Sequence, residues 1–574
     1  MIKLLKNLSV YKWLVVAIVG LVFIQSMADL FLPTLMADII DKGVVVGDIP
    51  YIWKIGAAML GVTAVSALAA IVASYFSSKA ALGMGRDIRH KVFRHVESFS
   101  LQEFDKLGTA SLITRTTNDI TQIQQVVIMM LRMVISAPIM LVGGLIMALS
   151  KDAKLSLVIV AVMPVLILTI ALILKKGVPL FQTVQKRLDR LNLVFRENLT
   201  GIRVVRTFNR EKDEQQRLQN ANKDLTDVSI KVNKLMAFMM PTMMLVMNLT
   251  VVGIIWFGGI RIDSGGMQIG DLMAYIQYVM MIMFSLVTAS MMFIMIPRAA
   301  VSAKRINEVL EMEPTFLDEG ALKADKEPGT LEFDRVSFYY PGADEPALSD
   351  ISFKAKAGEV TAIIGGTGAG KTTLINLIPR FYEVSSGSIC INGVNSKESS
   401  QDEIRSKIGF VPQKATLFSG TIAENIRFGK EEATEEEIEH AARIAQAEDF
   451  VVKMENGYES EITQGGSNVS GGQKQRLSIA RALIRKPDIY IFDDSFSALD
   501  YKTDANLRAA LKEETKDATV VIVAQRVSTV IDADQILVLD RGQLAGVGTH
   551  KELLETNDVY REIVESQLAE EEIA

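Results

Sequence analysis

Six apolar stretches, each long enough to cross a lipid bilayer, constrain the fold of this chain more than any other feature. They cover residues 14–36, 55–78, 133–150, 155–174, 235–260 and 272–297. A transmembrane helix needs about 20 predominantly apolar residues, and Asp29 is the only charged residue within the six stretches. The sequence therefore predicts a membrane domain of six transmembrane helices over residues 1–310.

The distribution of positive charge predicts the orientation of these helices. Lysine and arginine gather in two long segments, residues 79–132 and 175–234, whereas residues 38–50, 151–154 and 261–271 are short and poor in net positive charge. Positively charged loops stay in the cytoplasm. We therefore expect a multi-pass protein of the cell membrane with both termini and both long segments in the cytoplasm.

Both long segments are rich in helix formers and exceed the length of ordinary connecting loops. We expect each to extend a pair of membrane helices into the cytoplasm. Their tips, near residues 100–118 and 204–214, are candidates for contact with a cytoplasmic domain. The alternative is a pair of solvated helical hairpins without such a contact.

The rest of the chain predicts a cytoplasmic domain at residues 331–574, after a linker at 311–330. A net charge of −6 argues against nucleic acid as a partner. The single cysteine, Cys390, permits no internal disulfide and suits a reducing compartment.

A glycine-rich phosphate-binding loop follows a predicted strand at residues 360–364. The loop fits the pattern G-x-x-x-x-G-K-[ST]. Its backbone N–H groups and the start of the next helix favour bound phosphate, while a lysine reaches the β- and γ-phosphates and a hydroxyl ligates Mg²⁺. The residues predicted to bind ATP here are Gly365, Gly366, Thr367, Gly368, Ala369, Gly370, Lys371, Thr372 and Thr373.

Two further motifs follow in order along the chain. Residues 489–492 form an apolar strand that ends in Asp493, the usual placement of a second carboxylate directed at Mg²⁺. Between the loop and this strand stands the sequence Ser470, Gly471, Gly472, Gln473. This S-G-G-Q signature resembles that of ATP-binding-cassette (ABC) proteins, in which it completes the ATP site of the opposite subunit.

The resemblance extends over essentially the whole chain. It implies that Tyr340 stacks on adenine, that Gln413 links Mg²⁺ to the membrane domain, and that Asp500 is the D-loop acid. Residues 112–119 and 197–205 resemble cytoplasmic-loop motifs of six-span ABC exporters, closest to heterodimeric bacterial multidrug exporters of the LmrC and EfrC type. The implied fold class is a six-helix membrane domain followed by an α/β P-loop NTPase nucleotide-binding domain, with ATP and Mg²⁺ as cofactors and Thr372, Gln413 and Asp493 at the metal.

The sequence departs from the family at two positions that matter for hydrolysis. Asp494 stands where the family has a catalytic glutamate, and it is one methylene too short for a base that must come within about 3 Å of the attacking water. Gln525 stands where the family has a histidine and cannot carry positive charge. Gln464, in place of a common acidic residue, is a third departure. We expect this chain's own site to hold nucleotide rather than hydrolyse it efficiently.

The intact signature predicts a partner. Each of two ATP sites combines one chain's phosphate loop with the other chain's signature, so a homodimer would have two weakened sites. We expect a second half-transporter whose competent phosphate loop meets Ser470, Gly471, Gly472 and Gln473.

Methionines concentrate in the last two spans, which hold 13 of the 27 in the chain. Their flexible, polarizable side chains suit varied apolar ligands, although packing or lipid contact explains any one of them equally well. Asp29 lies within a span, where an ionisable group usually lines a polar pathway; the alternative is a hydrated helix kink before Pro33. The candidate substrate-cavity residues are Asp29, Met240, Met243, Gln277, Met280, Phe284, Thr288 and Met291.

The predicted function is ATP-driven export of amphipathic drugs or other hydrophobic compounds, cationic or neutral. A lipid or peptide exporter of the same fold and a non-pumping regulatory ABC subunit remain alternatives. A soluble ATPase with a membrane anchor would need only one or two spans.

Overall fold

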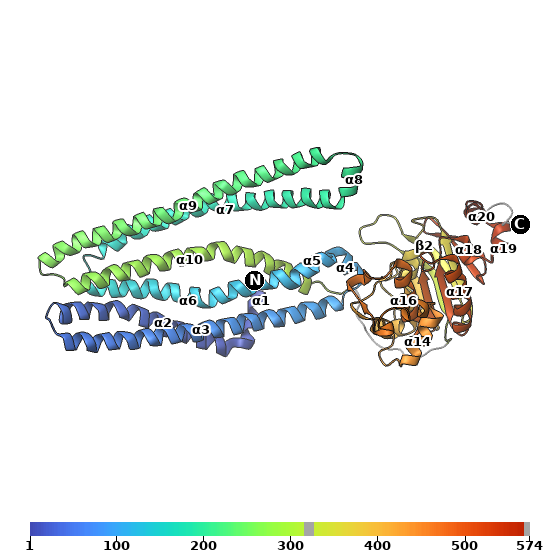
Figure 1. The fold of residues 1–574 in the computed structure, drawn as a ribbon, viewed down its shortest axis with the longest axis horizontal. Coiled ribbons are helices and arrows are strands. Elements are labelled where there is room, and N and C mark those ends of the chain that lie inside the picture. Colours follow the sequence, from blue (N-terminus) through green and yellow to red (C-terminus); the bar gives the residue numbers. More distant parts are fainter. Residues whose placement is uncertain (315–326, 568–574) are drawn as a thin grey trace. The chain divides into compact units, whose positions relative to one another are not determined.

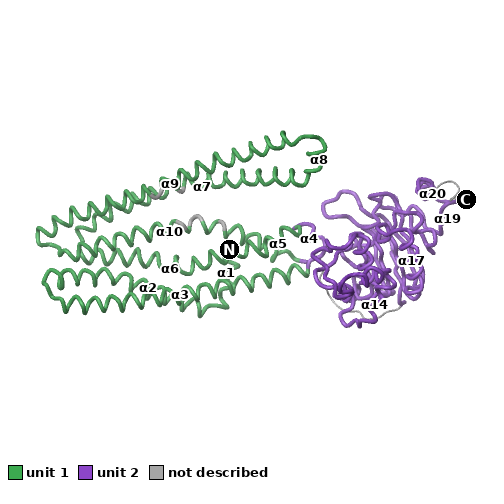
Figure 2. Tube along the Cα trace, viewed as in Figure 1, with its two compact units in different colours: residues 1–98, 108–313 green, residues 99–107, 314–574 purple. Residues whose placement is uncertain are grey.

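The chain comprises two compact units, coloured separately in Figure 2: residues 1–98 with 108–313, and residues 99–107 with 314–574. The structure is a computed structural model that describes residues 1–314 and 327–567, without the side chains of residues 174, 239, 240, 291, 293, 294 and 298.

The secondary-structure elements in the described part of the first unit are all helices. Its elements are α1 (Ile2–Leu5), η1 (Lys6–Tyr11), α2 (Lys12–Asp38), η2 (Ile39–Val44), α3 (Ile49–Glu97), α5 (Thr109–Thr114), η3 (Arg115–Asp119), α6 (Ile120–Lys151), α7 (Leu157–Thr200), α8 (Ile202–Thr207), α9 (Glu211–Asp263) and α10 (Ile269–Leu310).

Each predicted span falls in a different long helix, and the six helices are apolar and long enough to cross a membrane. The prediction of six spans is therefore confirmed. The fourth span starts slightly late because Asp152 Oδ1 accepts hydrogen bonds from the backbone N–H groups of Lys154 and Leu155, at 2.8 and 2.9 Å. This turn delays the start of α7 to Leu157.

The long helices continue well beyond a bilayer. At 1.5 Å per residue, the 53 residues of α9 span about 80 Å, against a hydrocarbon core of about 30 Å. Helices α7 and α9 run side by side as one long hairpin closed by α8 (Figure 1). Helix α2 packs on α3, and α6 packs on α10.

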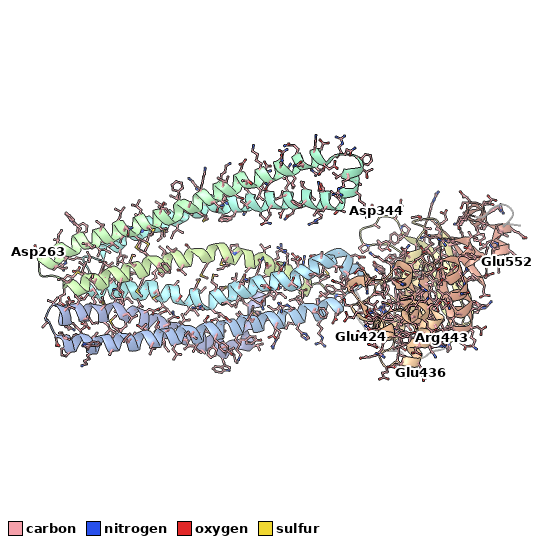
Figure 3. All side chains as sticks on the ribbon, in the orientation of Figure 1. Asp263, Asp344, Glu424, Glu436, Arg443 and Glu552 are labelled. Carbon is pink, nitrogen blue, oxygen red and sulfur yellow. The ribbon has the colours of Figure 1, made fainter. Side chains whose placement is uncertain are left out.

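Apolar side chains cover the outer faces of these helices, where lipid would surround them. Trp13, Leu60 and Trp256 are each more than 70% exposed. Figure 3 shows side chains projecting outward along the helices, with Asp263 at the end of α9, where the turn to α10 begins. Near that turn the buried Asp152 carboxylate pairs with Arg261 at 2.8 Å and so ties the α6–α7 connection to α9.

The second unit is built on a six-stranded sheet of order β12-β11-β3-β10-β9-β6 and a four-stranded sheet of order β2-β1-β4-β5, with a small β7-β8 pair. The strands are β1 (Leu331–Phe338), β2 (Leu348–Ala355), β3 (Val360–Gly365), β4 (Ser386–Ile391), β5 (Val394–Asn395), β6 (Ile408–Val411), β7 (Gly420–Thr421), β8 (Glu461–Ile462), β9 (Ile489–Asp493), β10 (Thr519–Val523), β11 (Gln535–Asp540) and β12 (Gln543–Gly548).

Helices cover these sheets and form their connections. They are α11 (Lys371–Leu377), α12 (Gln401–Ser406), α13 (Ile422–Arg427), α14 (Glu435–Ile444), α15 (Glu448–Val451), η4 (Gly457–Glu459), η5 (Gln464–Gly466), α16 (Gly471–Leu483), α17 (Tyr501–Glu514), α18 (Val527–Val530), α19 (His550–Thr556) and α20 (Asp558–Glu565).

Strands β3, β10 and β9 are parallel neighbours at the centre of the larger sheet. Their residues form continuous apolar runs that are almost completely buried, as expected for parallel strands covered on both faces. Because this core is buried, the carboxyl ends of β3, β10 and β9 have fixed positions at one edge of the sheet.

Helix α4 (Leu101–Leu107) belongs to the second unit although the sequence places it between α3 and α5. The Tyr382 hydroxyl donates a 2.8 Å hydrogen bond to Asp105 Oδ2. Of the tip predicted near residues 100–118, residues 100–107 therefore group with the C-terminal unit, whereas residues 108–118 group with the first unit. There Arg115 donates to the Arg305 carbonyl and to Glu308, at 2.7 and 3.2 Å.

Candidate functional site

Four neighbouring parallel strands bring the predicted nucleotide residues together. In the order β3-β10-β9-β6, the carboxyl ends of these strands lead into the glycine-rich loop, Gln525, Asp493 and Gln413 respectively. Ligands of open α/β sheets bind at this edge. Residues separated by more than 150 positions in the sequence thus form one site.

The loop between β3 and α11 has the shape of a phosphate cradle. Gly370 adopts a left-handed conformation with φ of 100°, and a Cβ there would lie 2.8 Å from the Leu348 side chain. In contrast, a Cβ on Gly366 or Gly368 would meet no atom within 4 Å. The glycines therefore allow a tight turn at one end of the loop and leave open space beside its backbone, which fits a bound phosphate chain.

Lys371 begins α11 and folds back over the loop. Its Nζ donates to the carbonyl oxygens of Gly365 and Gly366, at 2.7 and 2.9 Å. Burial lowers the pKa of this amine, against the opposing attraction of Asp494 and Asp493. The ammonium group therefore lies over the cradle, held by acceptors that a phosphate oxygen can replace.

Asp493 ends β9 and is buried. Burial raises its pKa to about 6, the nearby Asp494 carboxylate adds to the rise, and a hydrogen bond from Thr372 and the charge of Lys371 oppose it. A buried carboxylate beside a hydroxyl is an all-oxygen donor set of the kind Mg²⁺ prefers. Asp493 and Thr372 therefore fit the predicted metal position.

The side chains of Asp494, Gln525 and Gln413 meet beyond the carboxyl ends of β9, β10 and β6. Asp494 Oδ2 accepts hydrogen bonds from Gln525 Nε2 at 2.8 Å and from Gln413 Nε2 at 3.4 Å. The backbone at Asp494 has a φ of 48°, a conformation that is uncommon outside glycine. The carboxylate is thus engaged by two neutral amides.

The segment that carries Gln525 is held from the C-terminal side. Gln567 Nε2 donates to the Gln525 carbonyl at 2.9 Å, and Gln567 Oε1 accepts from the Val527 backbone N–H at 2.9 Å. No feature of the sequence pattern singled out Gln567. Only the fold brings it beside β10.

The signature lies at the start of α16. Ser470 caps this helix: its hydroxyl accepts from the Gln473 N–H at 3.3 Å, and its own N–H donates to Gln473 Oε1 at 2.8 Å. Gly471 faces open space, whereas a Cβ on Gly472 would lie 3.1 Å from the Ala498 carbonyl. Asp500 caps the next helix, α17, by accepting from Thr503.

Tyr340 lies beside the phosphate-loop helix. Its hydroxyl is 3.0 Å from Thr373 Oγ1, and its ring packs edge-on against Phe338 and Tyr382 with centroid separations of 5.0 and 5.6 Å. The ring remains 37% exposed. It therefore has a fixed orientation and an accessible surface, as a stacking platform requires.

Comparisons with known proteins agree with this architecture. The ABC transporter transmembrane region model matches residues 15–287, and the ABC transporter model matches residues 348–497. An uncharacterized ABC transporter ATP-binding protein of Mycobacterium tuberculosis (strain CDC 1551 / Oshkosh) is 42% identical over 98% of this chain and 97% of its own length.

The chain belongs to the ABC transporter family.

A solved bacterial Atm1-family ABC exporter with ATP bound superposes with a TM-score of 0.81, covering 98% of this chain and 99% of that one at 25% identity. The predicted fold class is confirmed, and the protein is an ATPase-coupled transporter with an ATP-binding domain.

Several related ABC transporters carry names that state a substrate. A fatty acid ABC transporter ATP-binding/permease protein of Mycobacterium bovis is 35% identical over 83% of this chain and 74% of its own length. A multidrug resistance ABC transporter ATP-binding and permease protein of Lactococcus lactis is 32% identical over 89% and 85%. An ATP-dependent lipid A-core flippase of Chromobacterium violaceum is 30% identical over 93% and 92%.

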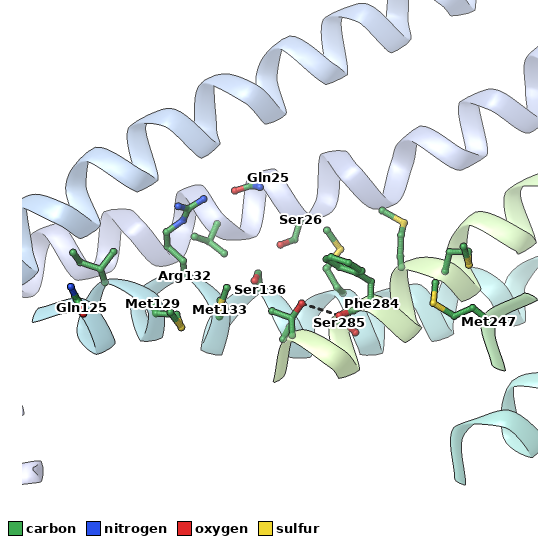
Figure 4. A pocket seen from close by; sticks show the side chains of 17 residues that line it. Gln25, Ser26, Gln125, Met129, Arg132, Met133, Ser136, Met247, Phe284 and Ser285 are labelled. Atoms are coloured by element: carbon green, nitrogen blue, oxygen red, sulfur yellow. Dashed lines mark hydrogen bonds between the residues drawn. The ribbon is translucent and has the colours of Figure 1, made fainter. Parts of the chain in front are cut away.

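The membrane unit of this ABC transporter contains a cavity of about 790 Å³ between α2, α6, α9 and α10 (Figure 4). Three of the predicted cavity residues line it: Met280, Phe284 and Thr288. Met243 and Gln277 are not among its described lining residues, and Met243 is buried in the helix packing. The predictions for the side chains of Met240 and Met291 lie outside the described residues.

Asp29 has a protein partner instead of a place in this cavity. Its Oδ1 accepts a 2.6 Å hydrogen bond from Ser66 of α3, and it is not among the described residues that line the cavity.

Sequence reasoning missed Arg132, which does line the cavity. Arg132 directly precedes the predicted span at residues 133–150, so a search for charges within the spans passed it by.

Proposed function

We propose that this chain is one half of a heterodimeric ABC exporter, with an ATP site of its own that holds nucleotide and a signature that completes the partner's hydrolytic site. The observation that carries the proposal is the hydrogen bonding of the Asp494 carboxylate. This carboxylate accepts from Gln525 and Gln413, so the group in the position of the catalytic base is short and engaged by amides. The signature, in contrast, has the family's residues on a capped helix.

In this proposal the glycine-rich loop and Lys371 bind the ATP phosphates, while Thr372, Asp493 and Gln413 surround Mg²⁺. The metal neutralises phosphate charge when it is bound. Gln525 donates a hydrogen bond but supplies no positive charge to the γ-phosphate. The site therefore favours occupancy over turnover.

The proposed topology places residues 1–310 as the transport domain and residues 331–574 as the ATP-binding domain, linked through 311–330. Both termini and the ATP-binding domain face the cytoplasm. The excess of lysine and arginine in the two long segments supports this orientation.

The proposed substrates are amphipathic drugs or other hydrophobic compounds. The methionine-rich lining of the cavity supports this class, as does the multidrug name of the Lactococcus lactis relative. Lipid export by the same fold is the second candidate, because two relatives are named for fatty acids and for lipid A-core. A peptide exporter or a non-pumping regulatory subunit lacks a comparable observation.

The test compares the purified chain alone with the chain purified together with a second half-transporter. We expect little ATPase activity from the chain alone and clear activity, stimulated by amphipathic compounds, from the pair. Equal turnover per ATP-binding domain in the two preparations would contradict the heterodimer.

A further inference from the structure

The cavity of the membrane unit contains one ionised side chain among its described lining residues, Arg132 of α6. Most of the remaining lining is apolar and rich in methionine, including Met129, Met133 and Met280. An arginine side chain stays charged in a protein. The cavity therefore combines an apolar wall with a fixed positive charge.

Arg132 has little compensation from the protein. Its Nη1 makes a long hydrogen bond of 3.4 Å to Ser74 Oγ. Within the described part of the chain, the guanidinium forms no ion pair with an aspartate or glutamate. A half-buried charge without a counter-ion is unfavourable in a low-dielectric setting, so an anion that enters the cavity gains attraction without first breaking an ion pair.

Further free donors lie near this charge. The side-chain amides of Gln25 and Gln125 line the cavity and form no hydrogen bond with other described protein groups. In contrast, Ser285 and Thr288 donate to carbonyls of their own helix, at 2.7 and 2.9 Å. Free polar hydrogens therefore come from α2 and α6 rather than α10.

Arg132 and Phe284 lie at different points along the cavity, and methionines occur beside both. Figure 4 shows Arg132 and Gln125 toward one end and Phe284 and Met247 toward the other. Arg132 also directly precedes the predicted span at residues 133–150, which is the inner-leaflet side in the proposed orientation. An amphiphile that enters from this leaflet keeps its head group near the depth of the guanidinium.

We propose that the cavity binds amphiphiles with a single anionic head group, a carboxylate or a phosphate, which Arg132 contacts while the tail packs against the methionines and Phe284. This inference rests on the proposed export function and names its substrate class. It reverses the charge expected from Asp29, whose carboxylate bonds to Ser66 outside the cavity lining. The planar guanidinium matches both head groups with paired hydrogen bonds.

The experiment measures competition against radiolabelled dodecanoate on the purified two-chain transporter at pH 8, below the micelle concentration of each probe. The competitors are dodecanoate, dodecyl phosphate, methyl dodecanoate and dodecyltrimethylammonium. We expect the two anions to compete at least about tenfold better than the ester and the cation, the effect of one hydrogen-bonded charge. Comparison of dodecanoate with dodecyl phosphate identifies the preferred head group.

Arg132→Gln tests the residue directly. We expect it to remove the advantage of the anions while the affinities for the ester and the cation stay within about twofold. Arg132→Lys keeps the positive charge but lacks the paired N–H donors of the guanidinium. We expect its affinity for the anions to fall between those of the wild type and Arg132→Gln. Arg196→Gln is the matched control, because Arg196 is an exposed arginine of α7 outside the cavity lining. Melting temperature and ATP binding are measured for each variant to verify folding.

The outcomes separate this inference from the export function on which it rests. Equal competition by all four probes overturns the anionic subsite, and so does unchanged anion affinity in both Arg132 variants. If the probes still stimulate ATPase activity in that case, the proposed export function is retained. Failure of every probe to bind or to stimulate ATPase activity overturns the subsite and also contradicts export of amphipathic compounds.

Discussion

The two halves of the nucleotide-binding surface in this chain are built differently. The phosphate half is assembled from the ends of β3, β10, β9 and β6, and it contains Asp494 and Gln525, the two residues on which the proposed loss of hydrolysis rests. The signature half is organised locally, by the capping box of Ser470 and Gln473 at the start of α16. The two halves are held by separate elements. Substitutions in one half can therefore alter its catalytic residues while the structure of the other half stays intact. Substitutions made in one half at a time test that separation.

The largest effect is expected from Ser470→Ala in the two-chain transporter. In the proposed heterodimer this hydroxyl faces the partner's γ-phosphate, and removal of one transition-state donor typically costs about 10²–10³-fold in rate. ATPase activity of the purified pair measures the loss. A variant that hydrolyses ATP normally would contradict the assignment of the signature to the competent site.

The control for this variant is Thr434→Ala. Thr434 and Glu437 form a capping box at the start of α14, as Ser470 and Gln473 do on α16. Loss of either cap costs about 1 kcal/mol of stability. Thr434→Ala is therefore expected to lower the melting temperature similarly and to leave hydrolysis nearly intact.

The next largest effect is expected from Lys371→Ala, which removes the ammonium group over the cradle. Loss of a charged hydrogen bond weakens binding by about 10- to 100-fold, so nucleotide occupancy of this chain's own site falls. Hydrolysis at the partner's site remains measurable and transport decreases. Photo-crosslinked nucleotide, assigned to one chain or the other, measures occupancy. If Lys371→Ala abolishes hydrolysis while Ser470→Ala spares it, the two sites are assigned the wrong way round.

A smaller change is expected from Asp494→Glu. The added methylene restores the reach of the base, but Gln525 still supplies no positive charge. We expect a gain well below the roughly 100-fold that a well-placed general base contributes. Single-turnover hydrolysis in a pair whose partner site is inactivated measures it, and Asp494→Glu combined with Gln525→His should exceed either change alone. Full activity from Asp494→Glu by itself would show that the aspartate is the only defect.

The smallest effect is expected from Asp29→Asn. The amide oxygen still accepts from Ser66, and the side chain does not line the described cavity, so transport of cationic and neutral compounds should both stay within about twofold of wild type. Vesicle uptake of one compound from each class measures this. A selective loss of cation transport would place the Asp29 charge on the substrate pathway after all.

The sequence predicted those features that depend on local pattern. Hydropathy located six spans, and a glycine-rich loop after an apolar strand marked the phosphate cradle. The contact of Asp494 with both Gln413 and Gln525 was not foreseeable from pattern, because it depends on the order β10-β9-β6, which places three distant segments side by side. Gln567 was missed for the same reason.

The cavity was predicted less well because helical periodicity defines a face without saying what that face meets. Phe284 and Thr288 share a face of α10 that lines the cavity, whereas Gln277 on the same predicted face does not. Arg132 was overlooked because hydropathy windows exclude the charged residues at their edges. A search for charges one helical turn beyond each apolar stretch would have found it.

The membership of α4 in the C-terminal unit affects how the two units are connected. The boundary between the two units crosses the chain three times, at residues 98/99, 107/108 and 313/314. The two units are therefore joined by three covalent connections, which follow α3, precede α5 and follow α10. The Asp105–Tyr382 hydrogen bond keeps α4 on the side of the ATP-binding domain. Tyr382 in turn packs against Tyr340, whose hydroxyl bonds to Thr373 of α11, so the middle segment is connected through two aromatic rings to the helix that follows the phosphate loop.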